Sequence, residues 1–461
     1  MTDTIGVLSD PQRADIIAAR VERLPSSGWH TQVRLLLGTA IFFDSWDIVL
    51  IAYVMPTLIG NWHLTPAQVG AIISSGFLGQ FFGAITFGWL GERFGRANTL
   101  KWTLYLLSIG GIAGGFSTNV TWLLWSRFIQ GLGIGGELPL GATYVNEVAK
   151  ARSRGVFVML FQLVAPVSVG LTSLIAVWVV GHWGWQWMFF IGSVPVLLTL
   201  PMRWVVPESP RWLARRGRLD EAEAVMNRLE ARIVASSERP LPPLPAVIPH
   251  EVVEKSDWRG LFRGRYLGRT LVVWAIWSTS LTVGYGLTTW LPTIFRTIYK
   301  LPIQDALLFG SAASLTHMVA TIGGIAVVDR WGRRPVFIWS FVLSSAPLIA
   351  LWCLSGTLSP IMVMVLAAIG GSMMSVPQVA MWLYAPEVYP TRMRALGTGF
   401  GSSVGRLSNA LIPLVIGYLL PLTGVNGVFA VFSALAVFGT VIVILFALER
   451  KGMTLEDAGA E

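Results

Sequence analysis

The chain carries little charge and almost no cysteine for its length. Of its 461 residues, 13% are charged and 54% are hydrophobic, which leaves too few polar side chains to cover a water-soluble protein of this size. The single cysteine, Cys353, excludes an intramolecular disulfide. The sequence also lacks a histidine cluster, a nucleophile beside a base and the lysine of a phosphate loop. We therefore expect no enzyme, no metal site and no cofactor.

Long apolar runs separated by short polar breaks fill most of the chain. A helix needs roughly 20 apolar residues to span a bilayer, and the runs predict twelve such helices. They are expected at 33–55, 67–90, 99–117, 121–146, 156–180, 185–206, 269–293, 306–328, 335–354, 358–385, 395–420 and 424–448. The sequence therefore predicts an all-α integral membrane protein surrounded by lipid.

The basic residues are concentrated in alternate loops. The even-numbered loops hold Arg93, Arg96, Lys150, Arg152, Arg154, Arg330, Arg333, Arg334, Arg392 and Arg394, whereas the odd-numbered loops hold Arg296 and Lys300. Cytoplasmic loops of membrane proteins carry this excess, so both termini are expected in the cytoplasm. The net charge of +9 is thus accounted for by topology and by anionic lipid headgroups, and we expect no nucleic-acid partner.

One long polar interval divides the expected spans into two groups of six. The predicted organisation is an N-terminal segment at 1–32, a six-helix bundle at 33–206, a linker at 207–268, a second six-helix bundle at 269–448 and a tail at 449–461. Within the linker, apolar residues recur at helical spacing from Leu219 to Ile233, which predicts a short amphipathic helix. A proline-rich stretch at 240–249 follows and is typical of a stiff connection.

The two groups of helices share loop motifs at a nearly constant offset. Gly91-Glu92-Arg93-Phe94-Gly95-Arg96 returns 237 positions later as Val328-Asp329-Arg330-Trp331-Gly332-Arg333. Glu147 returns as Glu387 after 240 positions, and Glu208 as Glu449 after 241. Three matches at one offset indicate a duplication, and two parallel six-helix halves suit alternating access around a central site.

Several motifs resemble those of the major facilitator superfamily of transporters. Its loop signature is matched by GWLGERFGR and VVDRWGRR, and its helix 4 pattern by RFIQGLGIGGELP. The branch that contains sugar porters and organic-ion carriers is similar to PESPRWL and PEVYPTRMR. The resemblance runs from about residue 33 to 456 and implies a carrier of small solutes with the major facilitator fold.

Charges at the inner helix ends are candidates for a cytoplasmic gate. Partly screened salt bridges there are weak enough to reopen, and the resemblance favours this role. The alternative is that the same charges only orient the protein in the membrane. The candidate gate residues are Glu92, Arg96, Glu147, Arg154, Asp329, Arg333, Glu387 and Arg394.

Few charged residues lie within the spanning helices, where each costs at least ~2.5 kcal/mol unless paired or hydrated. The helical rise places Asp47 and Arg127 at depths about 10 Å apart, which an arginine side chain and a tilted helix can mostly bridge. The resemblance to helix 1 of sugar porters implies that Asp47 accepts a proton and Arg127 tunes it. A permanent ion pair is the alternative, and Asp44 and Glu137 are competing proton sites.

Arg406 lies about 18 Å into a hydrocarbon core of ~30 Å. Its position matches a helix 11 arginine that is associated with anionic substrates in organic-ion and aromatic-acid carriers, which makes it the candidate carboxylate ligand. Bonds to backbone carbonyls, Asp44 or Asp47 are the alternative. His317 is interpreted as either a packing residue or a ligand. The other candidate substrate contacts are Tyr285, Thr289, Gln378, Trp382, Gln162, Ser402 and Asn409.

Helix 7 lacks the paired glutamines that sugar porters usually carry, and its GYGLTTWLP segment resembles niacin permeases and aromatic-acid symporters. The predicted function is uptake of a small aromatic monocarboxylate, nicotinate first, by a proton-coupled monomer in the bacterial inner membrane. Alternatives are a benzoate-type symporter, a broader organic-ion or drug carrier, a sugar porter and, from a different class, a nutrient receptor that does not transport.

Overall fold

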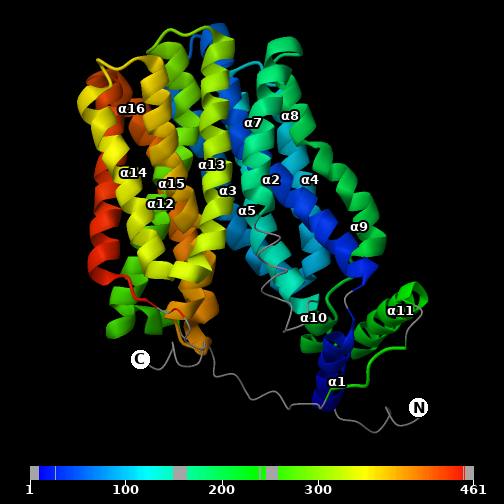
Figure 1. Cartoon of the computed structure of the whole chain (residues 1–461). Coiled ribbons are helices and arrows are strands. Elements are labelled where there is room, and N and C mark those ends of the chain that lie inside the picture. Colours follow the sequence, from blue (N-terminus) through cyan, green and yellow to red (C-terminus); the bar gives the residue numbers. More distant parts are fainter. Residues whose placement is uncertain are drawn as a thin grey trace.

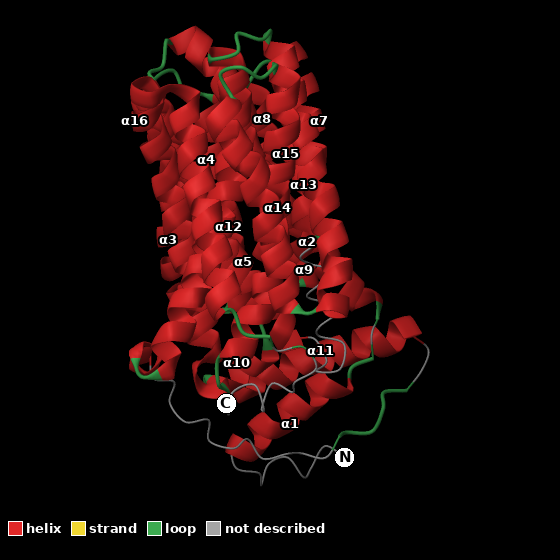
Figure 2. Cartoon of the chain, turned by 60° about the vertical axis from the view of Figure 1, so that its left-hand side comes forward, coloured by secondary structure: helices red, strands yellow, loops and turns green. Residues whose placement is uncertain are grey.

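A computed structural model describes residues 10–25, 27–148, 163–237, 240–245, 258–449 and 451. Within these residues the regular structure is helical throughout, and most helices run side by side along one axis (Figures 1 and 2). The first half contains α2 Gly28–Trp62, α3 Pro66–Phe94, α4 Arg96–Gly115, α5 Val120–Val148, α7 Val164–His182, α8 Gln186–Gly192, η3 Val194–Leu198 and α9 Thr199–Val205. The second half contains η4 Trp258–Phe262, α12 Arg265–Thr297, α13 Ile303–Trp331, α14 Arg333–Leu354, α15 Pro360–Val388 and α16 Thr391–Phe446.

Nine helical segments in the described part of the chain are long and apolar enough to cross a membrane. The longest is α16, whose backbone leaves the helical region at Gly424 with φ 66°, the residue at which the sequence predicts a new span to begin. Helices α4 and α5 cover the expected spans at 99–117 and 121–146 but are not among the nine. Residues 156–162 of the fifth expected span lie outside the described ranges. The count of twelve spans stays a prediction.

In the described part of the chain the two halves meet mainly where α3 packs on α16, α7 on α13 and α2 on α12. Glycine allows the first pair to touch backbone to backbone: a Cβ atom on Gly70 would lie 2.3 Å from the Pro413 carbonyl oxygen, and one on Gly417 would lie 2.4 Å from that of Pro66. The Tyr53 and Ser311 hydroxyls join the halves at 3.2 Å. Helix α2 begins shortly after α1 and ends at Trp62, so the first turns of α3, which contain Pro66 and Gly70, lie at the end of the bundle away from α1.

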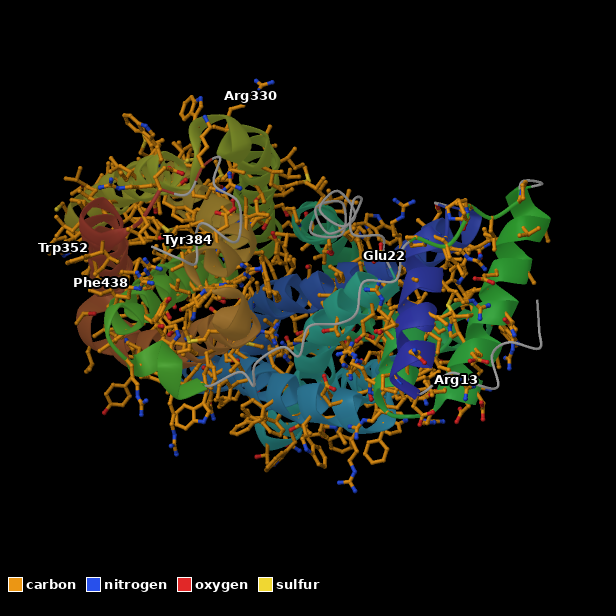
Figure 3. All side chains as sticks on the ribbon, turned by 90° about the horizontal axis from the view of Figure 1, so that it is seen from below. Arg13, Glu22, Arg330, Trp352, Tyr384 and Phe438 are labelled. Atoms are coloured by element: carbon orange, nitrogen blue, oxygen red, sulfur yellow. The ribbon has the colours of Figure 1, made fainter. Side chains whose placement is uncertain are left out.

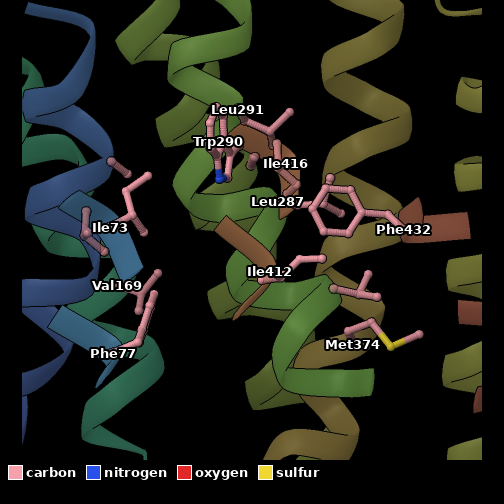
Figure 4. Close-up of a cluster of buried hydrophobic side chains, with 14 of the residues drawn as sticks. Ile73, Phe77, Val169, Leu287, Trp290, Leu291, Met374, Ile412, Ile416 and Phe432 are labelled. Atoms are coloured by element: carbon pink, nitrogen blue, oxygen red, sulfur yellow. The ribbon is translucent and has the colours of Figure 1, made fainter. Parts of the chain in front are cut away.

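The apolar core continues from one half into the other. Figure 4 shows Ile73, Phe77 and Val169 of the first half together with second-half residues of the same buried cluster, such as Trp290 and Leu291 of α12. The large ring of Trp290 in the same cluster is fully buried. Lipid tails are as apolar as these side chains, so contacts of this kind stabilise helix packing in a membrane through van der Waals attraction. The cluster therefore holds the halves together at the level shown.

Three further helices form a cap on one end of the bundle, which we call the linker end: α1 Asp10–Arg23, α10 Pro210–Arg215 and α11 Leu219–Ser237. Their shared core contains Ile17 and Val21 of α1 together with the α11 residues that recur at helical spacing, Leu219, Ala222, Met226, Leu229 and Ile233. Arg13 pairs with Asp220 at 2.7 Å, and Arg20 and Arg23 both pair with Glu230. Seen from the linker end, α1 and α11 lie beside the first half (Figure 3).

The duplicated motifs build the same structure twice. Gly95 and Gly332 both have positive φ, 100° and 94°, a conformation that suits glycine. At each position the next helix begins, and a distant glutamate accepts hydrogen bonds from its first amides. Glu208 accepts from Arg96 N at 2.7 Å, and Glu449 accepts from Arg333 N at 3.2 Å. A carboxylate at a helix N-terminus offsets the orphan amides and the helix dipole.

Candidate functional site

A cavity of about 160 Å³ lies between the two halves. Helices α2, α3, α5 and α7 provide one wall, and α12, α13, α15 and α16 provide the other. Its polar and aromatic lining residues are Asp44, Ser45, Phe77, Gln80, Trp277, Tyr285, His317, Thr321, Ser375, Gln378, Trp382, Ser402, Arg406 and Asn409. An enclosed apolar cavity of ~150 Å³ holds one benzene ring, so the space suits a molecule with a single ring.

Arg406 projects from α16 into this cavity and is the arginine that lines it. One guanidinium nitrogen donates to the Gly135 carbonyl oxygen on α5 at 2.9 Å, so the alternative of a backbone partner is realised for that nitrogen. Among the described residues no hydrogen bond is made by the other guanidinium nitrogens. Arg406 thus joins the halves and still presents donors to a ligand, and guanidinium donors suit two-point capture of a carboxylate.

Two aromatic pairs line the second-half wall. Trp277 of α12 and Trp382 of α15 are in edge-to-face contact, with ring centroids 5.1 Å apart. The rings of Tyr285 on α12 and His317 on α13 lie 6.4 Å apart at an angle of 31°. Flat aromatic faces stack on planar ligands, and the imidazole adds a group that can donate or accept a hydrogen bond.

The structure brings together six of the eight expected substrate contacts: Arg406, Tyr285, Gln378, Trp382, Ser402 and Asn409 all line the cavity. Thr289 is not among them, and its role as a substrate contact stays a prediction. This residue is fully buried outside the lining, and its hydroxyl donates to the Tyr285 carbonyl oxygen at 2.8 Å. It lies one helical turn beyond Tyr285, past the end of the cavity. Gln162 lies outside the described residues.

Asp47 and Arg127 form a buried ion pair between α2 and α5. Both carboxylate oxygens accept from the guanidinium, one of them at 2.9 Å, and Gln130 adds a further acceptor at 2.8 Å. Gly76 of α3 makes room for this pair, because a Cβ atom there would lie 2.8 Å from the arginine. The arginine side chain therefore spans the difference in depth between Asp47 and Arg127 that the sequence predicts. Neither side chain lines the cavity.

Asp44 and Glu137 form a second acidic group close to the first. Asp44 lines the cavity from α2, and Glu137 of α5 is 2% exposed. Their carboxyl groups lie within hydrogen-bonding range of each other, and Asp44 also interacts electrostatically with Arg406. In the described part of the chain, no donor reaches Asp44 Oδ1 or either oxygen of Glu137.

The described gate residues pair within one half each. Arg96 reaches Glu92 at 2.7 Å and Glu147 at 3.5 Å, and Arg333 reaches Glu387 at 2.8 Å. Arg394 donates to the Pro386 carbonyl oxygen. Among the ion pairs that the structure describes, none joins the two halves. Arg154 and the side chain of Asp329 lie outside the described residues. A role of these charges in closing the mouth between the halves stays a prediction.

Sequence reasoning missed Trp277 and left His317 undecided. The residues expected from this helix were Tyr285 and Thr289, whereas the face toward the cavity carries Trp277, Leu281 and Tyr285. These three residues are four apart and share a helix face, so their spacing was the available signal. His317 faces the same cavity from α13, which favours its interpretation as a ligand.

A family model described as "Sugar (and other) transporter" matches residues 37–461. The chain therefore belongs to this family of the major facilitator superfamily, whose members are transporters rather than enzymes. It is a multi-pass membrane transporter.

Individual relatives narrow the comparison. The chain is 31% identical to the niacin transporter NiaP of Acinetobacter baylyi, over 96% of this chain and 99% of that protein. It is 28% identical to a gallate transporter of Pseudomonas putida, over 87% and 88% of the two chains. A partially occluded, inward-open structure of the xylose transporter XylE from E. coli superposes with a TM-score of 0.74 at 20% identity, covering 93% of this chain and 100% of that one. That likeness shows the shared fold.

Proposed function

We propose that this protein takes up a small aromatic monocarboxylate, nicotinate first, by alternating access and together with protons. The observation that carries the proposal is the cavity between the halves, where the guanidinium of Arg406 faces a wall formed by Trp277, Trp382 and Tyr285. A single positive group beside aromatic faces is complementary to one ring that bears one carboxylate.

His317 favours nicotinate over benzoate. No ring nitrogen of His317 has a hydrogen-bond partner among the described residues, and the side chain is 6% exposed and lines the cavity. Nicotinate carries a ring nitrogen that a neutral imidazole N–H can reach, whereas benzoate has no polar atom on its ring. The names of the niacin and gallate transporters support the same substrate class.

The proposed orientation places the linker end in the cytoplasm of a bacterium, with the protein in its inner membrane. Inter-half contacts such as Gly70 with Pro413 and Tyr53 with Ser311 then close the outer side. The charges at the linker end, including Arg96 and Arg333, would exchange their present partners within each half for partners across the mouth when the inner side closes.

Counterflow in proteoliposomes tests the substrate and separates a carrier from a receptor. Vesicles loaded with unlabelled nicotinate should accumulate labelled nicotinate transiently, with weaker competition by benzoate and 4-hydroxybenzoate and the least by nicotinamide, a hexose and an organic cation. Binding without counterflow would make the protein a receptor. Competition by the hexose alone would overturn the substrate class, and stronger competition by benzoate than by unlabelled nicotinate would replace nicotinate with a benzoate-type acid.

A further inference from the structure

The buried acids Asp44 and Glu137 form no salt bridge among the described residues, and no donor reaches Asp44 Oδ1 or either oxygen of Glu137. The terminal nitrogens of Arg127 on α5 donate to Asp47 and Gln130, not to either acid of this pair. Two ionised carboxylates at hydrogen-bonding range repel each other, and in a dry site each also lacks solvation. A single proton between them removes the repulsion and turns one carboxyl group into a donor for the other. The geometry of the pair is therefore that of a proton-binding site.

Asp47 is less suited to this task although it lies on the same helix. Both of its oxygens accept hydrogen bonds from Arg127, and protonation would leave the guanidinium buried without its counter-ion. Breaking a buried pair in this way costs about 3–5 kcal/mol. The proton site that the resemblance placed at Asp47 is thus more favourable one helical turn away, at Asp44.

Arg406 connects this acid pair to the substrate position. It lines the same cavity as Asp44, interacts with it electrostatically and donates to the carbonyl oxygen of Gly135, two residues before Glu137. In the empty carrier, one shared proton leaves the pair with a charge of −1, which the guanidinium balances. A substrate carboxylate on Arg406 removes that balance.

Resting on the proposed function, we propose that Asp44 and Glu137 form one proton-binding unit and that capture of the substrate anion by Arg406 draws in a further proton. The other charged or titratable groups around the unit add no net charge. Asp47 and Arg127 neutralise each other, and the scheme takes Tyr285 and His317 in their neutral forms. Binding of the proton and the anion is then mutually favourable, as linkage requires, and the loaded site is electrically neutral.

Infrared spectroscopy of the purified protein tests the pair without any substrate. At pH 7 the wild type should show the C=O stretch of a buried protonated carboxyl group, and Asp44→Asn and Glu137→Gln should each remove or shift this band. Both substitutions are nearly isosteric and remove an unpaired charge, so folding is expected. Glu147→Gln is the matched control, because Glu147 is buried and paired with Arg96 and Arg215 and its loss should leave the band in place. A wild type without the band, or a band that survives both acid substitutions, overturns the shared-proton site.

Proton release and uptake on ligand addition test the coupling. Nicotinate added to the wild type in weak buffer should draw about one proton per bound molecule, read with a pH indicator. Glu147→Gln, which changes a buried acid outside the unit, should keep the proton uptake of the wild type, and the double variant Asp44→Asn/Glu137→Gln should take up no proton. Nicotinate binding without proton uptake in the wild type overturns the coupling while leaving the substrate standing. Absence of counterflow refutes the proposed substrate, and the infrared result still decides the proton site.

Discussion

The two halves of this transporter share one scaffold but bury different chemistry. The first half places Asp44, Asp47, Arg127 and Glu137 in its interior. At the positions 240 residues after Asp47 and Arg127 the second half has Leu287 and Ala367, both packed in the apolar core. Duplication therefore preserved the packing and allowed the interior charges to diverge.

The second half compensates with neutral and aromatic groups and one cation. Arg406 stands 240 positions after Pro166, and both residues line the cavity. Trp277, Tyr285 and His317 surround the space beside the arginine. Under the proposed function, this difference assigns charge balance to the first half and recognition of the ring and the carboxylate to the second half.

The largest expected effect comes from breaking the charge pair of the first half. Asp47→Asn leaves Arg127 buried without its counter-ion and should lower stability by about 3–5 kcal/mol, seen as a marked fall in the unfolding temperature in detergent. The double variant Asp47→Leu/Arg127→Ala installs the residues of the second half, Leu287 and Ala367, and should recover much of the loss. Unchanged stability of Asp47→Asn would show that the pair has no structural role.

The next effect concerns anion recognition in the second half. Arg406→Gln removes the charge but keeps a polar side chain, so nicotinate should lose about 1.5–3 kcal/mol of binding free energy, roughly 10-fold to 150-fold in affinity. Nicotinamide, which is neutral, should bind the variant and the wild type equally. Arg406→Lys keeps the charge without the planar fork and should fall between the two. Equal nicotinate affinities by calorimetry would exclude Arg406 as the carboxylate ligand.

A smaller effect is expected at the imidazole of the same wall. His317→Phe keeps a flat ring beside Tyr285 and removes the polar atoms, so the preference for nicotinate over benzoate should fall by about 1 kcal/mol, or several-fold. Competition in the counterflow assay measures this ratio directly. Tyr285→Phe keeps the imidazole in place and serves as the control. If the preference for nicotinate over benzoate falls equally in both variants, His317 does not form a hydrogen bond with the ring nitrogen.

The duplicated helix caps allow the shared scaffold itself to be tested. Glu208→Gln and Glu449→Gln each weaken hydrogen bonds to the first amides of α4 and α14, and each should cost about 1 kcal/mol. The two losses should be similar and should add in the double variant, because the sites lie in different halves. Thermal unfolding gives all three values. A large loss of stability in one half alone would mean that the two helix caps contribute unequally to stability.

The smallest effect lies in the cap on the first half and depends on pH. Partial burial by itself raises the pKa of Glu230, but hydrogen bonds from Arg20 and Arg23 outweigh it and lower the pKa below its usual value. The ionised form is favoured in the docked state, so docking of α1 is fully stabilised above ~4.3, the ordinary glutamate pKa, and weakens as the pH falls through the lower docked value. Hydrogen exchange of α1 at pH 7, 5 and 3.5 measures the stability of its docking. The variant Glu230→Gln should reduce the dependence of this stability on pH.

The sequence predicted the helices more accurately than it predicted which residues line the cavity. Apolar runs and repeated loop motifs predicted the helical architecture, because lipid permits few ways to satisfy backbone groups and glycine is needed where φ is positive, as at Gly95 and Gly332. Which face of each helix points toward the cavity was harder to predict. Thr289 was expected in the cavity, but its hydroxyl is satisfied within its own helix. Trp277 of the same helix, which was not expected there, lines the cavity.

By itself, the sequence determined the membrane-spanning helical class, the duplication and the presence of four interior charges in the first half, since each follows from composition, from repeated motifs or from position within one apolar segment. Only the tertiary structure decided which charges are neighbours. It paired Asp47 with Arg127, left Asp44 facing Glu137 and placed Arg406 against Gly135. These contacts depend on how neighbouring helices rotate and approach, which glycines such as Gly76 permit and which no spacing within a single helix specifies.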